Sequence, residues 1–254
     1  MDQATFAADA EIEERHWWFS GRRRLFAKLV SELHLARDAR ILDAGTSTGT
    51  NLRLLRDLDF TAVQGVDISH EAIRFCAEKG LGVVEYGDLN NLPFDADRFD
   101  LVLATDIIEH LDDDQTALNE LARVVKPGGH VLVTVPAFPA LWGRQDEVAH
   151  HKRRYRWSGL AEKLRVAGLV CVERFHFNFL LFGPIWAARQ VIGWLRIPLR
   201  SENDVNSPVI NAILTGVFRL DTWLARGLRP PFGVSILALC QKPPAVRASL
   251  PCAA

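Results

Sequence analysis

The chain has 254 residues, 48% hydrophobic and 24% charged, with a formal net charge of −1. This size and composition fit one large globular domain and argue against disorder. A net charge near zero provides no global field that would draw the protein to nucleic acid or to an anionic membrane. The cysteines form no C-x-x-C pair, and no histidine stands near one of them at metal-ligand spacing, so we expect free thiols, a cytoplasmic location and no metal site. Charged residues interrupt the N-terminus, so we expect no signal peptide there.

The first 39 residues are predicted to form a helical arm, since apolar residues recur at helical spacing from about residue 8 to residue 35. The arm contains three adjacent aromatic residues, Trp17-Trp18-Phe19, followed by Arg22-Arg23-Arg24. Three such side chains cannot all face one core, so two interpretations stay open. The arm packs onto the domain as a staple, or it is a lid whose Trp18 and Arg23 contact the substrate.

From residue 40 onward, predicted strands and helices alternate. Strands are expected at residues 40–43, 62–67, 82–86, 99–104, 130–135, 170–177 and 235–241. Helices are expected at residues 48–58, 69–79, 112–125 and 158–167, and the turn Lys126-Pro127-Gly128-Gly129 precedes the fifth strand. This alternation predicts an α/β fold with a Rossmann-like, seven-stranded, mostly parallel sheet and helices on both faces. Ligands bind such folds at the carboxyl ends of the strands.

The expected core comprises residues 40–176 and 235–242, with a helical cap at 177–234 and a flexible tail at 243–254. The cap contains two long apolar segments, 177–199 and 207–228. The uncharged run between Arg174 and Arg189 is shorter than the ~20 apolar residues of a spanning helix, so we expect no integral membrane span. Core packing, an apolar substrate and peripheral contact with a membrane surface stay open as roles of the cap.

A turn of small residues, Gly45-Thr46-Ser47-Thr48-Gly49, joins the first strand to the first helix of the core. Such a turn lets a ligand approach the backbone, and the N–H groups at the helix start face that ligand. Acidic residues follow the predicted strands at Asp43, Asp67, Asp88 and Asp106. We expect Asp67 to accept hydrogen bonds from ribose hydroxyls and Asp88 from an adenine amine.

From Ile41 to Val135 the chain resembles the class I S-adenosylmethionine-dependent methyltransferases. The first motif of that family is similar to residues 43–49, except that Ser47 stands in place of the middle glycine, and Thr105-Asp106-Ile107-Ile108-Glu109-His110 resembles its fourth-strand motif. We expect Ser47 to shift the loop slightly and cofactor binding to be retained. The resemblance implies S-adenosyl-L-methionine as methyl donor, bound by Asp43, Gly45, Thr46, Thr48, Gly49, Asn51, Asp67, Ile68, Asp88, Leu89 and Thr105.

Other segments resemble one bacterial subgroup of these enzymes: the arm at residues 16–19 and the stretches 136–142, 151–155 and 231–235. The chain departs from the subgroup at Gln145, where histidine is expected, and at His150, where glycine is expected. Both departures lie in the loop expected to bind substrate, so the catalytic roles that the resemblance implies for this loop stay open.

We expect His151, and after it His110, to act as general base toward the acceptor, a role that contributes about 10²–10⁴-fold where a proton must be removed. A structural role is the alternative for both, and anion binding a further one for His151. The run Lys152-Arg153-Arg154-Tyr155-Arg156 is either a solvated face or a substrate site, in which Arg154 and Tyr155 bind a carboxylate or phosphate. It is too short to predict nucleic-acid binding.

The sequence therefore predicts methyl transfer to an O or N nucleophile of a small molecule such as a sugar, a lipid-linked compound or a secondary metabolite. The alternative is a non-catalytic protein that binds S-adenosylmethionine or regulates a partner. A nicotinamide-dependent reductase is disfavoured, because Asn51 stands at the third glycine position and the chain has no Tyr-x-x-x-Lys. The acceptor and the oligomeric state stay unassigned.

Overall fold

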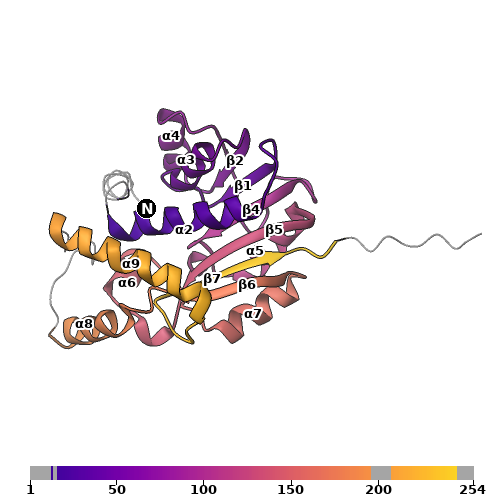
Figure 1. Ribbon diagram of the computed structural model, residues 1–254. Coiled ribbons are helices and arrows are strands. Elements are labelled where there is room, and N and C mark those ends of the chain that lie inside the picture. The colour runs from indigo at the N-terminus through magenta and orange to yellow at the C-terminus, as the bar shows by residue number, and fades with distance from the viewer. Residues whose placement is uncertain (1–12, 14–15, 196–206, 245–254) are drawn as a thin grey trace, which may run out of the picture.

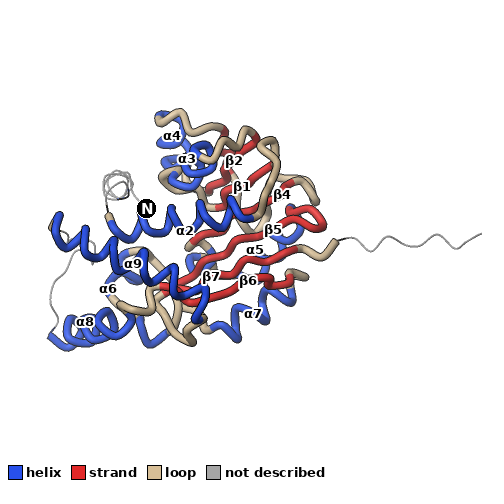
Figure 2. Tube along the Cα trace, in the orientation of Figure 1, coloured by secondary structure: helices blue, strands red, loops and turns tan. Residues whose placement is uncertain are grey.

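The structure, a computed structural model, describes residues 13, 16–195 and 207–244. At its centre lies a seven-stranded sheet in the order β3-β2-β1-β4-β5-β7-β6 (Figures 1 and 2). The strands are β1 (Arg40–Ala44), β2 (Ala62–Asp67), β3 (Val83–Tyr86), β4 (Phe99–Thr105), β5 (Val125–Pro136), β6 (Val170–Phe177) and β7 (Ser235–Gln241). Only β7 runs antiparallel to its neighbours, β5 and β6. The predicted fold class is confirmed.

Alternate residues of the central strands enter two cores on opposite faces of the sheet. Ile41 and Leu101 pack into one core, whereas Leu42 and Val102 pack into the other. Successive side chains of a strand point to opposite faces, so a sheet that is covered on both faces needs nearly continuous apolar strands. The apolar runs of β1, β4 and β5 meet this need.

Each face is covered by its own helices. On one face α2 (Trp17–Glu32) and α9 (Pro208–Leu228) lie side by side, near α3 (Thr50–Asp57) (Figure 1). On the other face α5 (Asp114–Val124) and α7 (Trp157–Val166) supply the apolar side chains. The remaining helices are α4 (His70–Glu78), α6 (Arg144–Val148), α8 (Phe182–Leu195) and the 3₁₀ turns η1 (Ile108–His110) and η2 (Pro139–Leu141).

Helix α2 is packed onto the sheet as a staple. Trp18 stacks on Phe177 with 5.8 Å between ring centroids and meets Phe218 of α9 edge-on at 5.4 Å. A Cβ added to Gly21 would lie 2.3 Å from the Phe218 ring, so the two helices approach this closely only because residue 21 is glycine. These contacts argue against the predicted contact of Trp18 with substrate, because its ring is used in packing. Residues 1–12, 14 and 15 of the predicted arm lie outside the described residues.

The fifth strand begins earlier than expected. The segment Lys126-Pro127-Gly128-Gly129, predicted as a turn before the strand, belongs to β5. Its backbone pairs with Lys242, which directly follows β7. Gly128 N–H donates to Lys242 O at 2.8 Å, and Lys242 N–H donates to Gly129 O at 3.0 Å. Pairing across 114 residues of chain thus outweighs the local turn preference. The predicted tail lies outside the described residues from residue 245 onward.

The predicted cap contains α8 and α9, but α9 also contributes to the domain core. Phe218 and Ala225 are fully buried against the sheet, and the buried Asp221 carboxylate accepts backbone N–H bonds from Asn178 at 2.6 Å and Leu180 at 2.8 Å. These bonds fix α9 to the segment that follows β6. In the part of the chain that the structure describes, no helix has the length and apolar character needed to cross a membrane.

Candidate active site

The turn between β1 and α3 brings backbone to the carboxyl edge of the sheet. Gly45 has a φ of +77°, and a Cβ added there would lie 2.5 Å from the Ile107 side chain. Gly49 has a φ of +81°, and its added Cβ would lie 2.4 Å from Leu81. Both the left-handed backbone and the lack of space require glycine at these two positions.

Ser47 adopts the conformation that the expected glycine would adopt. Its φ is +50°, in the left-handed region that costs an L-residue about 1–2 kcal/mol. The Ser47 N–H donates to Asp67 Oδ2 at 2.8 Å, and Ser69 N–H donates to Oδ1 of the same carboxylate at 2.8 Å. Asp67 therefore holds the turn in place, and its remaining lone pairs can accept bonds from a ligand.

Asp43 lies beneath the turn and is fully buried. Its Oδ1 accepts from the Asn51 amide at 2.9 Å, and the same amide donates to Thr105 Oγ1 at 3.0 Å. Its Oδ2 has no hydrogen-bond partner in the part of the chain that the structure describes. Burial raises the pKa of Asp43 to about 7, against the opposing hydrogen bond from Asn51. An orphaned, buried carboxylate oxygen fits a cationic or hydrogen-bond-donating ligand.

A cavity of about 400 Å³ lies over this turn and extends between α2 and the end of β4. Nine of the predicted site residues line it, namely Arg23, Gly45, Thr46, Thr48, Asn51, Asp67, Ile68, Thr105 and His110. The structure thus brings residues from β2, β4, α2 and the turn after β1 to one cavity. Another hollow, of about 670 Å³, lies at the amino ends of the strands, and none of the predicted site residues lines it.

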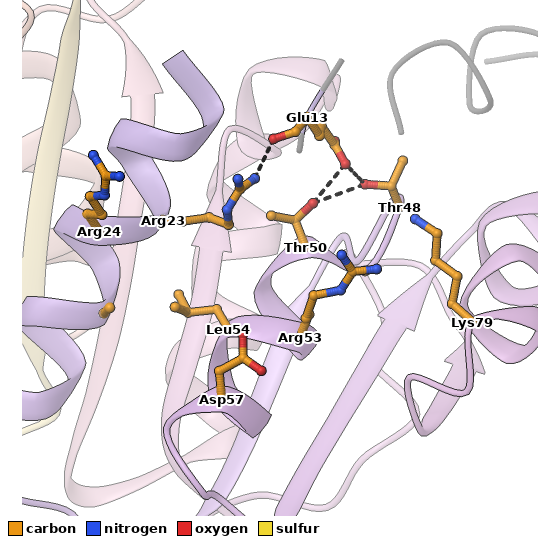
Figure 3. Close-up of a pocket in the computed structure, with 11 residues that line it drawn as sticks. Glu13, Arg23, Arg24, Thr48, Thr50, Arg53, Leu54, Asp57 and Lys79 are labelled. Atoms are coloured by element: carbon orange, nitrogen blue, oxygen red, sulfur yellow. Dashed lines mark hydrogen bonds between the residues drawn. The ribbon is translucent and has the colours of Figure 1, made fainter. Parts of the chain in front are cut away.

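The arm reaches the outer side of the same turn. The Glu13 carboxylate accepts hydrogen bonds from the Thr48 and Thr50 hydroxyls, the latter at 2.8 Å, and Arg23 donates to the Glu13 carbonyl (Figure 3). Here α3 begins, so a carboxylate meets the positive end of the helix. Cationic side chains border the adjoining hollow of about 460 Å³: Arg23, Arg24, Arg53 and Lys79.

The two predicted bases meet at the other end of the cavity. His110 ends η1, His151 follows α6, and their ring centroids are 4.8 Å apart. His110 lines the cavity, whereas His151 lies behind it. Burial lowers the pKa of His110 to about 4, with a further contribution from His151, so the His110 ring is neutral at pH 7. Of the two, His110 is the one in direct reach of a bound acceptor.

A network of buried side chains holds His151 from behind. Asp146 is fully buried and lies 2.8 Å from both His151 Nδ1 and Arg154 Nε. Burial acts to raise the pKa of Asp146, but the hydrogen bonds from His151 and Arg154 outweigh it and keep the pKa below its usual value. Arg154 also donates to Ala137 O at 2.9 Å. Arg154 is thus part of the wall, and its predicted contact with substrate is not supported by its position.

The rest of the cationic run is likewise paired within the protein. Tyr155 is buried, and its hydroxyl donates to Asp114 Oδ2 at 2.7 Å. Arg153 lies 3.1 Å from Asp114, and Lys152 pairs with Asp112. The middle of the run, Arg153 to Tyr155, is thus held inside the protein, whereas Lys152 and Arg156 at its ends are exposed. Like Arg154, Tyr155 does not line the cavity, and its predicted substrate contact is replaced by a structural one.

The predicted adenine pair lies beyond the lining of the cavity. Asp88 is exposed and accepts a bond from Asn90 N–H at 2.9 Å, whereas Leu89 is 4% exposed within the core. Their predicted contact with adenine stays a prediction. Beside them, Tyr86 stacks on His70 with 4.6 Å between ring centroids.

Several site residues were missed by the sequence analysis. Arg22 of α2 pairs with Asp106 across the cavity at 2.6 Å, and Thr134 donates to the other oxygen of Asp106 at 3.1 Å. Glu109 is fully buried beside His151, and among the described residues neither of its carboxylate oxygens has a hydrogen-bond partner. Asp106 and Glu109 lie just after β4, and their place at the carboxyl end of a strand could have marked them as site residues. No local pattern marks the pairing of Asp146 with His151 and Arg154.

Comparisons with known proteins agree with this arrangement. Residues 42–133 match the family model described as a methyltransferase domain. A tRNA (carboxymethyluridine(34)-5-O)-methyltransferase from Arabidopsis thaliana is 41% identical over 110 residues, which cover 42% of this chain and 25% of that protein. A 2-methyl-6-phytyl-1,4-hydroquinone methyltransferase from Oryza sativa subsp. japonica is 32% identical over 112 residues, which cover 42% of this chain and 32% of that protein. The chain thus spans a third or less of the length of these two relatives.

A solved structure extends the likeness of fold to nearly the whole chain. A chain of the Haloferax volcanii complex between the Trm112 methyltransferase activator and its methyltransferase aligns over 96% of both chains, with a TM-score of 0.64 and 22% identity. Strand order, antiparallel β7 and the glycine turn define the class I methyltransferase fold. Residues 42–133 thus match a methyltransferase domain, and the whole described chain has the fold of such enzymes. The cofactor of this class is S-adenosyl-L-methionine.

Proposed function

We propose that this protein transfers a methyl group from S-adenosylmethionine to an O or N nucleophile of a small molecule. The observation that carries the proposal is a single cavity with two unlike ends. At one end lies the glycine turn with the buried Asp43 beneath it, and at the other His110 lines the cavity with His151 next to it. Such a cavity can hold a donor and an acceptor next to each other, and alignment of two bound reactants contributes about 7–11 kcal/mol in favourable cases.

The residues at the first end fit the cofactor. Gly45 lines the cavity without a side chain of its own, so a ligand can lie against its backbone. The orphaned Asp43 Oδ2 and the lone pairs of Asp67 can accept from the ammonium and hydroxyl groups of the cofactor. When bound, S-adenosylmethionine supplies a methyl group that its sulfonium already activates. The protein has to orient this methyl and exclude water.

At the second end His110 faces the acceptor. A neutral imidazole can accept the proton of a hydroxyl or ammonium nucleophile, and His110 is neutral at pH 7 because burial lowers its pKa. His151 stands behind it, oriented by Asp146. We therefore propose His110 as the group that meets the acceptor and His151 as a positioning residue.

For the acceptor we propose a small molecule with an apolar part. One relative is named for a phytyl-hydroquinone and another for a tRNA, so the relatives leave the class of acceptor open. In this chain the cationic run is paired with carboxylates, which disfavours a polyanion such as tRNA. Apolar side chains on α9 are exposed at helical spacing, at Val209, Ile213, Leu220 and Trp223. They would suit peripheral contact with a membrane that contains the acceptor.

The cytoplasmic location expected from the sequence is also part of the proposal. It is supported by the cysteines among the described residues, Cys76, Cys171 and Cys240, which are free thiols.

The first test is calorimetric titration of the full chain with S-adenosylmethionine and S-adenosylhomocysteine. We expect one site per chain, with at least tenfold weaker binding in Asp67→Ala. No binding by the wild-type protein, or equal binding by the variant, would contradict the cofactor site. Turnover is then screened with labelled donor against metabolite and lipid extracts and against bulk tRNA. Binding without turnover on any extract would favour the alternative of a non-catalytic, S-adenosylmethionine-binding regulator.

A further inference from the structure

A cluster of three potential metal ligands closes the acceptor end of the cavity. It consists of Glu109 and His110 on η1 and His151 after α6, and one potential ligand atom of each lies within 4.8 Å of the other two. The cluster joins two segments that are more than 40 residues apart in the chain. One member, His110, also lines the cavity, so the cluster is accessible from it.

Glu109 lacks the partners that a buried carboxylate needs. It is fully buried, and neither Oε1 nor Oε2 has a hydrogen-bond partner among the described residues. A buried carboxylate is stable only when it is protonated, paired or bound to a metal. Arg22 pairs with Asp106 and Arg154 with Asp146, and although both also favour a charged Glu109, burial still raises the pKa of Glu109 well above its usual range. A cation would complete the surroundings of Glu109.

His151 has the orientation of a metal-binding histidine. Its Nδ1 is held by Asp146 Oδ1 at 2.8 Å, which directs Nε2 toward Glu109 Oε1 at 4.0 Å. Asp146 is itself fixed by Gly143 N–H at 2.8 Å and by Arg154. A histidine that binds a metal through one nitrogen commonly donates from the other to a carboxylate, which fixes the ring and raises its basicity.

We propose that Glu109, His110 and His151 form a binding site for one divalent transition-metal ion, with Asp146 as the residue that orients His151. Two histidines and one carboxylate suit Zn²⁺, Fe²⁺, Mn²⁺ or Co²⁺, and leave coordination positions open on the side of the cavity. Ligand atoms around a tetrahedral ion at ~2.1 Å lie about 3.4 Å apart, so small side-chain movements bring the cluster to this geometry. The proposal departs from the expectation of no metal site.

The role of the ion rests on the proposed methyl transfer, although its binding does not. A bound ion would lower the pKa of an acceptor hydroxyl that coordinates to it, so that the hydroxyl proton could pass to water, and would hold the oxygen in one place. In this arrangement the two histidines act as ligands, and the ion replaces the proposed action of His110 on the acceptor.

The test is metal binding by the full, untagged chain after treatment with EDTA and dialysis, with no cofactor or acceptor present. We expect Co²⁺ to give a saturable visible spectrum at one ion per chain, and Zn²⁺ to displace it. Binding should be lost in Glu109→Gln and His151→Ala, and weakened 10–100-fold in Asp146→Asn. His34→Ala removes an exposed histidine and is the matched control, with unchanged binding expected.

Wild-type protein that binds no Co²⁺ or Zn²⁺, or Glu109→Gln that binds as well as wild type, would overturn the site. Where a variant does not fold, the wild-type chain still decides the question, since saturating Zn²⁺ should raise its melting temperature and EDTA should reverse the shift. Cofactor titration of the metal-free chain reports separately on the proposed function. Cofactor binding without metal binding overturns only the metal site, and the reverse result overturns only the methyltransferase assignment.

Discussion

The two ends of the cavity are built in different ways. At the cofactor end, polar groups follow neighbouring parallel strands, and backbone geometry at Gly45, Ser47 and Gly49 sets the site. At the acceptor end, side chains from distant segments are held by buried ion pairs around Asp146. Substitutions that disturb the backbone should therefore damage the cofactor end most. At the acceptor end, the removal of single side chains should have the larger effect.

The largest expected effect is on the acceptor end. Asp146→Ala leaves the buried Arg154 guanidinium without its partner, and removing one member of a buried ion pair costs about 3–5 kcal/mol. We expect a loss of this size in the free energy of unfolding measured with urea. Glu147→Ala is the control, because Glu147 is exposed and pairs with Arg144 at the surface. Its loss should stay below ~1 kcal/mol. Similar losses in Asp146→Ala and Glu147→Ala would show that the buried ion pair stabilises the chain no more than the surface pair does.

The next effect tests the backbone at the cofactor end. Gly45→Ala adds a Cβ that meets Ile107 at 2.5 Å, whereas Gly80→Ala has the same left-handed strain, at a φ of +63°, with no atom within 4 Å. Both should lose about 1 kcal/mol of stability. Only Gly45→Ala should weaken cofactor binding, by at least tenfold in calorimetry. Equal affinities would show that the turn does not position the cofactor.

A smaller effect is expected for Tyr155→Phe. The variant removes the hydroxyl that donates to Asp114 at 2.7 Å and should cost about 1.5 kcal/mol in urea unfolding. Since Tyr155 lies in the wall, the KM for the acceptor should be unchanged. Tyr86→Phe, at an exposed position, should be within ~0.5 kcal/mol of wild type. A raised KM for Tyr155→Phe would restore its predicted contact with substrate.

The smallest effect, when taken per unit of pH, is a dependence of stability on pH. Burial raises the pKa of Asp43 from 3.8 to about 7 in the folded chain. Between these values the folded chain holds a proton that the unfolded chain has lost. The contribution of Asp43 to stability is therefore full below about pH 4 and is lost as the pH rises to about 7. We expect a slope of up to ~1.4 kcal/mol per pH unit, measured by urea unfolding. Asp43→Asn should lack this slope. An identical slope in the variant would show that a group other than Asp43 causes the dependence on pH.

Most strands of the sheet could be predicted because their signals are local. Predicted and observed bounds of β2 agree at residues 62–67, and those of β6 and β7 agree as well. The glycine turn and Asp67 were found because strand ends and turns carry characteristic residues. The start of β5 was missed because its pairing with Lys242 lies far along the chain.

The acceptor end could be predicted only in part. His110 and His151 were named, but their proximity depends on how η1 and the segment after α6 pack together. The cations of residues 152–156 suggested a ligand site because sequence alone does not show which carboxylates face them. Asp112, Asp114 and Asp146 do so in the folded chain. A run of charges thus has no fixed meaning until its partners are known.

The contact of Gly21 with Phe218 has a consequence for how ligands affect one another. Helix α2 brings Arg22 and Phe26 to the cavity wall, and through Gly21 it fits closely against α9, whose outer side chains are exposed. A displacement of one helix requires a displacement of the other. Whatever binds on α9 and shifts it therefore changes the affinity of the cavity for its ligand. By thermodynamic reciprocity, the ligand in the cavity changes the affinity at α9 by the same factor.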